Sequence, residues 1–189
     1  MDILKIAFNT FPELETERFI LREVKEQDYT EIYDIYCDEE AVRYQQIEPM
    51  TTMEQAQKSV VHFISSYENK KFIRWCISDK NYDKVVGLIT LHDFDNWNSK
   101  AEIGYMLNKK YWRKNIMYEA GEKVIQYAFE VIGLHRIEAL IHPENIASNR
   151  LSMKLGFKEE GLKKSSAYNR RTGEFEDRLI YGIINCKDI

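Results

Sequence analysis

A short basic segment contains the residues with the clearest chemical potential in this chain. It carries four cations just before a stretch of helical periodicity: Lys109, Lys110, Arg113 and Lys114. The first backbone N–H groups of a helix have no internal acceptor, and the positive end of the helix dipole adds to their attraction for anions. With flexible cations beside it, such a helix start binds phosphate groups. The alternative is a solvated basic turn without a ligand, and this segment alone does not separate the two.

Two regular elements position the basic segment. From 101 to 107 the residues alternate between two faces, which predicts a β-strand with Glu102, Gly104 and Met106 on one of them. From Met117 to Gly133 apolar residues recur at three- and four-residue steps, which predicts an amphipathic helix that ends at the glycine. A strand, a basic loop and a helix packed on the sheet are therefore expected in succession.

The composition limits the kind of protein. With 189 residues, 44% of them hydrophobic, the chain suits a single domain spanning 1–189. A net charge of −4 and a pI near 5.7 argue against general nucleic-acid binding. The N-terminus lacks the apolar core of a signal peptide, and no stretch approaches the ~20 apolar residues of a membrane helix. Cys37, Cys76 and Cys186 are far apart and include no CxxC pair, which predicts a reduced cytoplasmic protein with cysteines as packing residues.

The other segments predict the order β-α-α-β-β-β-α-β-α-β-β. Capping-box patterns that start at Asp28 and at Thr51 open the first two helices. Asn145 can cap a short later helix, which Gly156 ends in the left-handed conformation. The expected strands are 16–24, 71–78, 84–92, 101–107, 135–141, 157–168 and 175–184, with hairpin turns after the second and the sixth.

This order and five sequence blocks resemble the GNAT superfamily of acetyl-CoA-dependent N-acetyltransferases, and within it the ribosomal-protein (Rim-type) branch. The blocks are ETERFILREVKEQD, VGLITLHDFD, AEIGYML, YEAGEKVIQYAFEVIGLHRIEALIHPENIASNRLSMKLGFKEEG and DRLIYGI. The most specific part is the N-x-x-S-x-x-x-x-x-K-x-G-F pattern from Asn145 to Phe157. The resemblance implies an α+β fold, layered α/β/α, with a mixed, mostly antiparallel sheet of about seven strands and about four helices.

The resemblance also implies where acetyl-CoA binds. The loop 112–118 resembles the pyrophosphate cradle of the family, in which backbone amides hold the diphosphate. The strand end at Met106 and Leu107 would bind the pantetheine arm, and a backbone N–H near Leu107 would stabilise the oxyanion. The implied cofactor-binding residues are Met106, Leu107, Trp112, Arg113, Lys114, Asn115, Ile116, Met117, Tyr118, Asn145 and Ser148. The four histidines lack metal-ligand spacing, so no metal is expected.

Two departures from the family pattern concern binding and catalysis. Asn115 and Met117 stand where the usual loop has small residues. Asparagine tolerates positive φ, but the Met117 side chain must point away from the diphosphate or narrow the cradle, so Met117→Ala is expected to tighten binding.

The second departure concerns catalysis, because Ser152 stands where many members carry a tyrosine that acts as the general acid. This leaves Ser148 as the hydroxyl that protonates the thiolate. Glu102 would take the amine proton, directly or through water, or would instead be a strand carboxylate paired with a cation.

The pKa of the acceptor favours one substrate class. An α-amine with a pKa of ~7.7–8.0 is partly neutral at pH 7, whereas lysine at ~10.4 is almost fully charged. Direct attack on the thioester needs no enzyme nucleophile. The prediction is an N-acetyltransferase acting on the N-terminal α-amine of a protein such as a ribosomal protein. A polyamine or aminoglycoside acceptor and a degenerate CoA-binding module stay open, and exposed β-rich edges leave a homodimer open.

Overall fold

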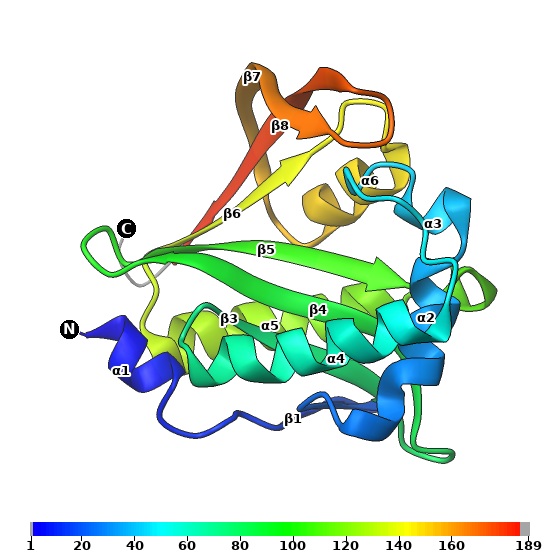
Figure 1. Ribbon diagram of the computed structural model, residues 1–189. Helices are drawn as coiled ribbons and strands as arrows, with labels where there is room; N and C mark the ends of the chain where they lie inside the picture. Colours follow the sequence, from blue (N-terminus) through cyan, green and yellow to red (C-terminus); the bar gives the residue numbers. More distant parts are fainter. Residues whose placement is uncertain (1, 186–189) are drawn as a thin grey trace.

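The computed structural model describes residues 2–185, and its centre is one eight-stranded sheet (Figure 1). The strands lie in the order β1-β2-β3-β4-β5-β6-β8-β7. Neighbouring strands are antiparallel, except that β5 and β6 are parallel. The strands are β1 (Leu14–Glu15), β2 (Phe19–Arg22), β3 (Phe72–Asp79), β4 (Lys84–Asp95), β5 (Lys100–Leu107), β6 (Arg136–Ile141), β7 (Lys158–Asn169) and β8 (Glu174–Ile184).

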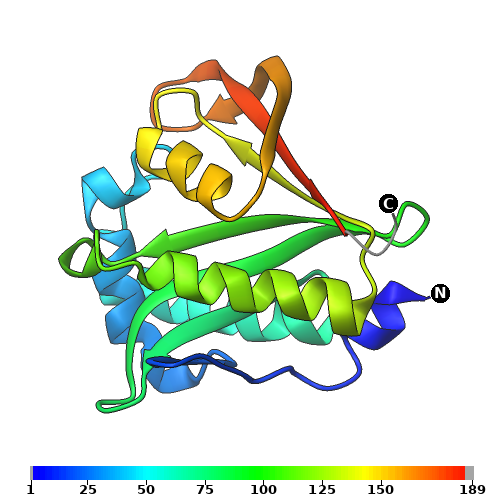
Figure 2. The same ribbon diagram turned by 180° about the vertical axis from the view of Figure 1, so that it is seen from behind.

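Helices cover both faces of the sheet, which confirms the expected α/β/α layering. One face carries α2 and α4, and the opposite face carries α5 and α6 (Figures 1 and 2). The helices are α1 (Ile3–Ala7), α2 (Tyr29–Tyr36), α3 (Glu39–Val42), α4 (Met53–Glu68), α5 (Ile116–Tyr127) and α6 (Ile146–Lys154). Two 3₁₀ turns, η1 (Glu26–Asp28) and η2 (Lys109–Tyr111), precede α2 and α5, and the π-helical segment η3 (Ala128–Ile132) extends α5 to Gly133.

Each face of the sheet has its own apolar core. Val124 of α5 packs in one buried cluster with Ile103 of β5. Val60 of α4 packs in the other cluster with Leu88 and Met106. Because successive side chains of a strand point to opposite faces, β5 contributes to both cores. Burial of each such side chain stabilises the fold by ~1.5–3 kcal/mol, so β5 is held firmly from both sides.

The predicted order of elements is confirmed, and three short elements, α1, β1 and α3, are added to it. Two predicted caps are wrong. The Asp28 side chain makes no cap bond to α2, because both its oxygens accept from the Arg22 guanidinium at 2.8 and 2.9 Å. The capping box of α4 lies one residue after Thr51, where Thr52 and Gln55 exchange hydrogen bonds. The sequence offers the same motif in both registers, Thr51 with Glu54 and Thr52 with Gln55, and the structure uses the second.

The two central parallel strands separate after a short contact. Residues 100–102 of β5 pair with residues 136–138 of β6, after which β6 continues only alongside β8 within the described chain. The strands diverge toward their C-terminal ends, as Figure 1 shows. The loops that start α5 and α6 follow these two ends. The split therefore leaves the second half of β5 with an open edge between the two helix starts.

Two of the cysteines are described, and both are free thiols. Cys76 is buried and Cys37 is half-buried, as expected for packing residues, while Cys186 lies outside the described residues. None of the described helices is long and apolar enough to cross a membrane.

Candidate active site

The loop between β5 and α5 has the backbone shape of an anion site. Arg113 and Asn115 adopt the left-handed conformation, with φ of 62° and 57°, which few non-glycine residues take. Glu119 N donates to Asn115 O at the start of α5. Within residues 2–185 we find no acceptor for the backbone N–H groups of residues 113–118. These donors, at the positive end of α5, fit the diphosphate of a CoA-type ligand.

Cations lie around this loop. Arg113 and Lys114 are exposed beside it, as predicted. Lys154, the last residue of α6, donates to Asn115 Oδ1 at 3.2 Å and lies 4.0 Å from the centroid of the Tyr118 ring. Sequence reasoning did not assign Lys154 a role. The only sign of one was its place in the pattern that links Asn145 to Phe157.

Three of the predicted cofactor residues are apolar side chains that point into the protein. Ile116 and Met117 are 3% and 6% exposed and belong to the core on the α5 face. Met106 is buried in the core on the α4 face. These residues can offer a ligand only their main chains. The Met117 side chain therefore does not narrow the loop, and the expectation that Met117→Ala tightens binding loses its physical basis.

The end of β5 directs main-chain groups toward the open edge. Asn108 N donates to Val86 O at 2.9 Å. Bonding direction alternates along an antiparallel strand, so Tyr105 and Leu107 turn their N–H and C=O groups away from β4 and toward the split. Trp112 Nε1 donates to Leu107 O at 2.9 Å and so ties the loop to the strand. The Leu107 carbonyl oxygen therefore already accepts one hydrogen bond. The Leu107 N–H is a donor, so it is the group on this residue that can stabilise an oxyanion.

The start of α6 faces the same opening with polar side chains. Asn145 caps the helix as predicted, since its Oδ1 accepts from Ser148 N at 3.2 Å, which leaves its amide N–H groups for a ligand. Ser148 Oγ lies 2.6 Å from the Tyr105 hydroxyl. Burial raises the pKa of Tyr105, although hydrogen bonding with Ser148 and Ser152 opposes the shift. The sequence singled out Ser148 but missed Tyr105, which only the crossing of β5 and α6 brings beside it.

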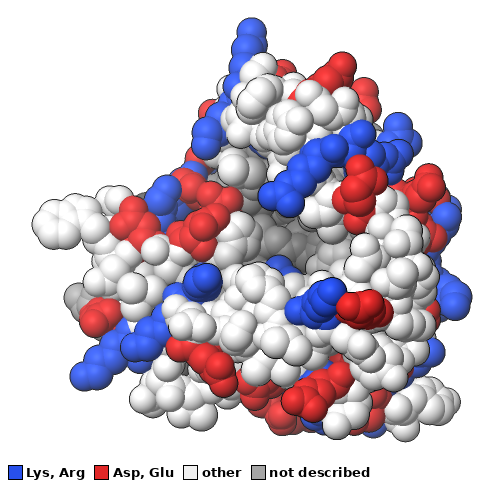
Figure 3. Space-filling view, in the orientation of Figure 1, with Lys and Arg blue, Asp and Glu red and all other residues white. Residues whose placement is uncertain are grey.

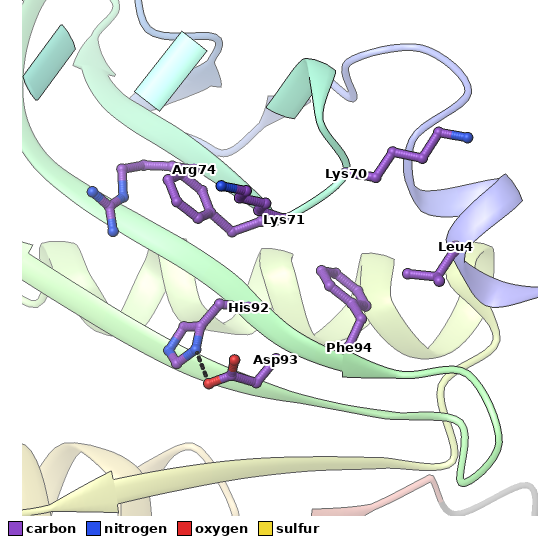
Figure 4. Close-up of a pocket in the computed structure, with 8 residues that line it drawn as sticks. Leu4, Lys70, Lys71, Arg74, His92, Asp93 and Phe94 are labelled. Atoms are coloured by element: carbon purple, nitrogen blue, oxygen red, sulfur yellow. Dashed lines mark hydrogen bonds and ion pairs between the residues drawn. The ribbon is translucent and has the colours of Figure 1, made fainter. Parts of the chain in front are cut away.

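Glu102 lies on the opposite face of β5, where the two strands begin to separate. It pairs across the sheet with His92 of β4, and His92 Nδ1 lies 2.8 Å from Asp93 Oδ2 (Figure 4). Burial raises the pKa of Glu102, and His92 partly offsets this. The ligand atoms of these three residues lie within 4.8 Å of one another. His92 and Asp93 line a surface pocket together with Lys70, Lys71 and Arg74, and these three positive charges do not favour a bound cation (Figure 4).

The surface is hollowed between the α4 side and the β7–β8 side of the molecule (Figure 3). One carboxylate of α3 and one of β8 are paired with cations. Lys109, one of the four loop cations, turns to Glu40 at 2.5 Å, so it does not join the phosphate-binding group. Arg178 lies 3.0 Å from Glu176 on β8. Glu40 and Glu176 are therefore each neutralised by a cation of the protein.

A split sheet with free amides and cations at its opening defines a transferase that uses a nucleotide-linked acyl donor. Residues 18–158 match the family model described as an acetyltransferase (GNAT) domain, and the chain belongs to this family. The uncharacterized N-acetyltransferase YoaA of Bacillus subtilis is 35% identical over 178 residues, which cover 94% of this chain and 99% of YoaA. GNAT acetyltransferases use acetyl-CoA, and this protein is an acetyl-CoA-dependent N-acetyltransferase.

Solved structures agree with the fold. A GNAT acetyltransferase from Bacillus anthracis superimposes with a TM-score of 0.82 at 25% identity, covering 92% of this chain and 99% of that one. RimJ of Mycobacterium smegmatis in complex with CoA-disulfide gives a TM-score of 0.79 at 22% identity, covering 95% and 90%. The resemblance seen in the sequence is thereby confirmed at the level of family and fold.

Proposed function

We propose that this protein transfers the acetyl group of acetyl-CoA to the N-terminal α-amine of a protein, such as a ribosomal protein. The observation that carries the proposal is the set of free N–H groups of residues 113–118 beside the open edge of β5. The acceptor class rests on acidity, because deprotonating lysine at pH 7 costs about 4–5 kcal/mol and an α-amine costs only about 1. YdaF of Bacillus subtilis, 36% identical over 104 residues, has a provisional name as a ribosomal N-acetyltransferase, which supports this class.

Each residue has one task in the proposed reaction. Acetyl-CoA supplies an acetyl group activated as a thioester. The loop amides and Arg113 and Lys114 hold the diphosphate. The N–H of Leu107 polarises the acyl oxygen. The Ser148 hydroxyl faces the departing sulfur, and Glu102 takes the proton that the amine loses.

Glu102 would act through water rather than by direct contact. Glu102 and Leu107 are five positions apart on β5, which is about 16 Å at ~3.3 Å per residue. Its raised pKa makes it a stronger base than an ordinary carboxylate. The α4 face of β5, on which it lies, is also the hollowed face of Figure 3. A chain of waters on that face would carry the proton away from the amine.

A polyamine acceptor is the second candidate. Spermidine N(1)-acetyltransferase of Escherichia coli is 22% identical over 141 residues, covering 75% of this chain. A polyamine carries several positive charges and needs unpaired carboxylates to hold them. Glu40 and Glu176 are paired with Lys109 and Arg178, which favours an acceptor with fewer charges. A degenerate module is disfavoured because Asn115 and Met117 leave the loop donors open.

The proposal is tested by acceptor profiling with a thiol-release assay. The panel contains a peptide with a free N-terminus, the same peptide N-acetylated but with an internal lysine, spermidine and an aminoglycoside. We expect rapid thiol release with the peptide that has a free N-terminus and with none of the other three acceptors. Preference for spermidine or for the lysine peptide would overturn the acceptor class. Calorimetric binding of CoA without turnover on any amine would overturn the transfer itself.

A further inference from the structure

Three hydroxyl groups from two elements meet at the open edge of β5. Tyr105 reaches from the strand, while Ser148 and Ser152 stand one turn apart on α6. Tyr105 OH lies 2.6 Å from Ser148 Oγ, and the hydroxyl of Ser152, which is 1% exposed, is close enough to lower the pKa of Tyr105. A buried hydroxyl is costly unless it is hydrogen-bonded, so such a cluster is held in a defined arrangement.

The distances indicate which way the protons point. The single proton of Tyr105 can go to Ser148 Oγ at 2.6 Å or to the Ser148 carbonyl oxygen at 3.3 Å. The shorter contact is the stronger one, and the carbonyl already has an intrahelical acceptor role toward residue 152. Ser152 can then donate to the Tyr105 oxygen. In this arrangement Ser148 accepts from Tyr105, and its own proton is left unused by the cluster.

A serine in a helix tends to donate its proton to the carbonyl four residues before it. For Ser148 that carbonyl belongs to Glu144, in the loop before α6, and the choice would direct the proton away from a ligand at the open edge of β5. A short bond from Tyr105 restricts the rotation of the Ser148 hydroxyl, because the oxygen must keep a lone pair aimed at the phenol. Phenylalanine would fill the same space as Tyr105, so packing alone does not require the hydroxyl.

We propose that Tyr105 is a positioning residue for acetyl transfer, whose phenol donates to Ser148 Oγ and aims the Ser148 proton at the sulfur of CoA. The inference rests on the proposed role of Ser148. As the C–N bond forms and the C–S bond breaks, the bonding electron pair goes to sulfur. The Ser148 hydroxyl then donates a hydrogen bond to this thiolate. The amine loses one proton to the base, and water carries that proton from the base to the sulfur, so one proton leaves nitrogen and one reaches the thiolate. Burial keeps Tyr105 neutral, as a donor must be.

The test compares Tyr105→Phe, Ser148→Ala and the double variant with the wild type. Tyr82→Phe is the matched control, because Tyr82 is 82% exposed in the turn between β3 and β4. One readout is independent of turnover: the pKa of the thiol of bound CoA, followed by the ultraviolet absorbance of the thiolate. The other is the division of the rate effect between kcat and the KM for acetyl-CoA.

In Tyr105→Phe we expect the bound thiol pKa to rise by about one unit and kcat to fall about tenfold, which is the same free energy. The KM for acetyl-CoA should not change, and the double variant should resemble Ser148→Ala. An unchanged thiol pKa and kcat in Tyr105→Phe would overturn the role of Tyr105, as would a loss expressed only in KM. If the thiol of CoA has the same pKa bound to the wild type as in solution, the proposed role of Ser148 fails as well. The wild-type measurement therefore separates a failure of Ser148 from a failure of Tyr105 alone.

Discussion

Lys154 and Asn115 join the end of α6 to the start of α5, because Lys154 Nζ donates to Asn115 Oδ1 at 3.2 Å. Asn115 holds the left-handed conformation at the N-cap of α5 and uses its side chain for this contact rather than for capping. The same lysine lies over the Tyr118 ring. One side chain from α6 therefore contacts two residues of segment 113–118, whose backbone N–H groups have no acceptor within residues 2–185.

Substitutions of Asn115 should separate backbone shape from side-chain contact. Left-handed backbone costs about 1–2 kcal/mol in ordinary residues and almost nothing in glycine. We expect Asn115→Ala to weaken CoA binding about tenfold, and Asn115→Gly to weaken it by a smaller factor through the loss of the Lys154 contact. Calorimetric titration with CoA measures both. Equal losses in the two variants would show that the backbone conformation does not matter.

Replacement of Met117 should affect stability rather than affinity. The side chain is 6% exposed in the core on the α5 face. Truncating a buried methionine to alanine costs about 2–5 kcal/mol, so Met117→Ala should lower the free energy of unfolding in urea by that amount, with the CoA affinity of the folded protein unchanged. Met53→Ala is the control, because Met53 is 41% exposed at the start of α4. Tighter CoA binding by Met117→Ala would restore the interpretation first drawn from the sequence.

Local sequence patterns were sufficient to predict features that involve only a residue and its near neighbours in the chain, such as helix caps and positive φ. Asn145 caps α6, Gly156 takes positive φ after it, and Asn115 tolerates positive φ before α5. Each of these depends on a few neighbouring residues, so the sequence contains the information. The same holds for the two faces of β5, whose alternation was enough to predict that Met106 and Leu107 differ in direction.

What the sequence could not provide depends on residues far apart in the chain. The strand β1 exists only because Leu14 pairs with Leu21 of β2. The divergence of β5 from β6 leaves no mark on either strand alone, although it creates the open edge. Tyr105 meets Ser148 across 43 positions. Alternation predicts the face of a residue but does not predict which neighbour that face will touch.

The buried ion pair of Arg22 and Asp28 should be a main support of the N-terminal half. Both side chains are buried, and Asp28 Oδ2 also accepts from Lys25 N at 2.7 Å. Removing one partner of a buried pair leaves the other charge unpaired, which costs about 3–5 kcal/mol. Asp28→Asn should therefore lose that much free energy of unfolding. Asp83→Asn, which removes an exposed partner of the same arginine, should lose less than about 1 kcal/mol. Similar losses in both variants would contradict this.

Glu102→Gln should lower activity and raise stability together. The pKa of Glu102 is raised above its ordinary value of 4.5, mainly by burial, so the folded state binds its proton more tightly than the unfolded state does. Stability from this group is therefore present at low pH and is lost as pH rises above 4.5. We expect Glu102→Gln to be more stable than the wild type at pH 8 but not at pH 4, and to lose about 100-fold in kcat if the carboxylate is the base.

Glu138 is the matched control on β6. Burial would raise its pKa, but hydrogen bonds from Arg136 and Lys100 hold it below the ordinary value. Glu138→Gln should thus be destabilised at pH 8, the opposite sign, as measured by urea unfolding across the pH range. A Glu102→Gln enzyme with full kcat and an unchanged pH–rate profile would exclude this carboxylate as the proton acceptor.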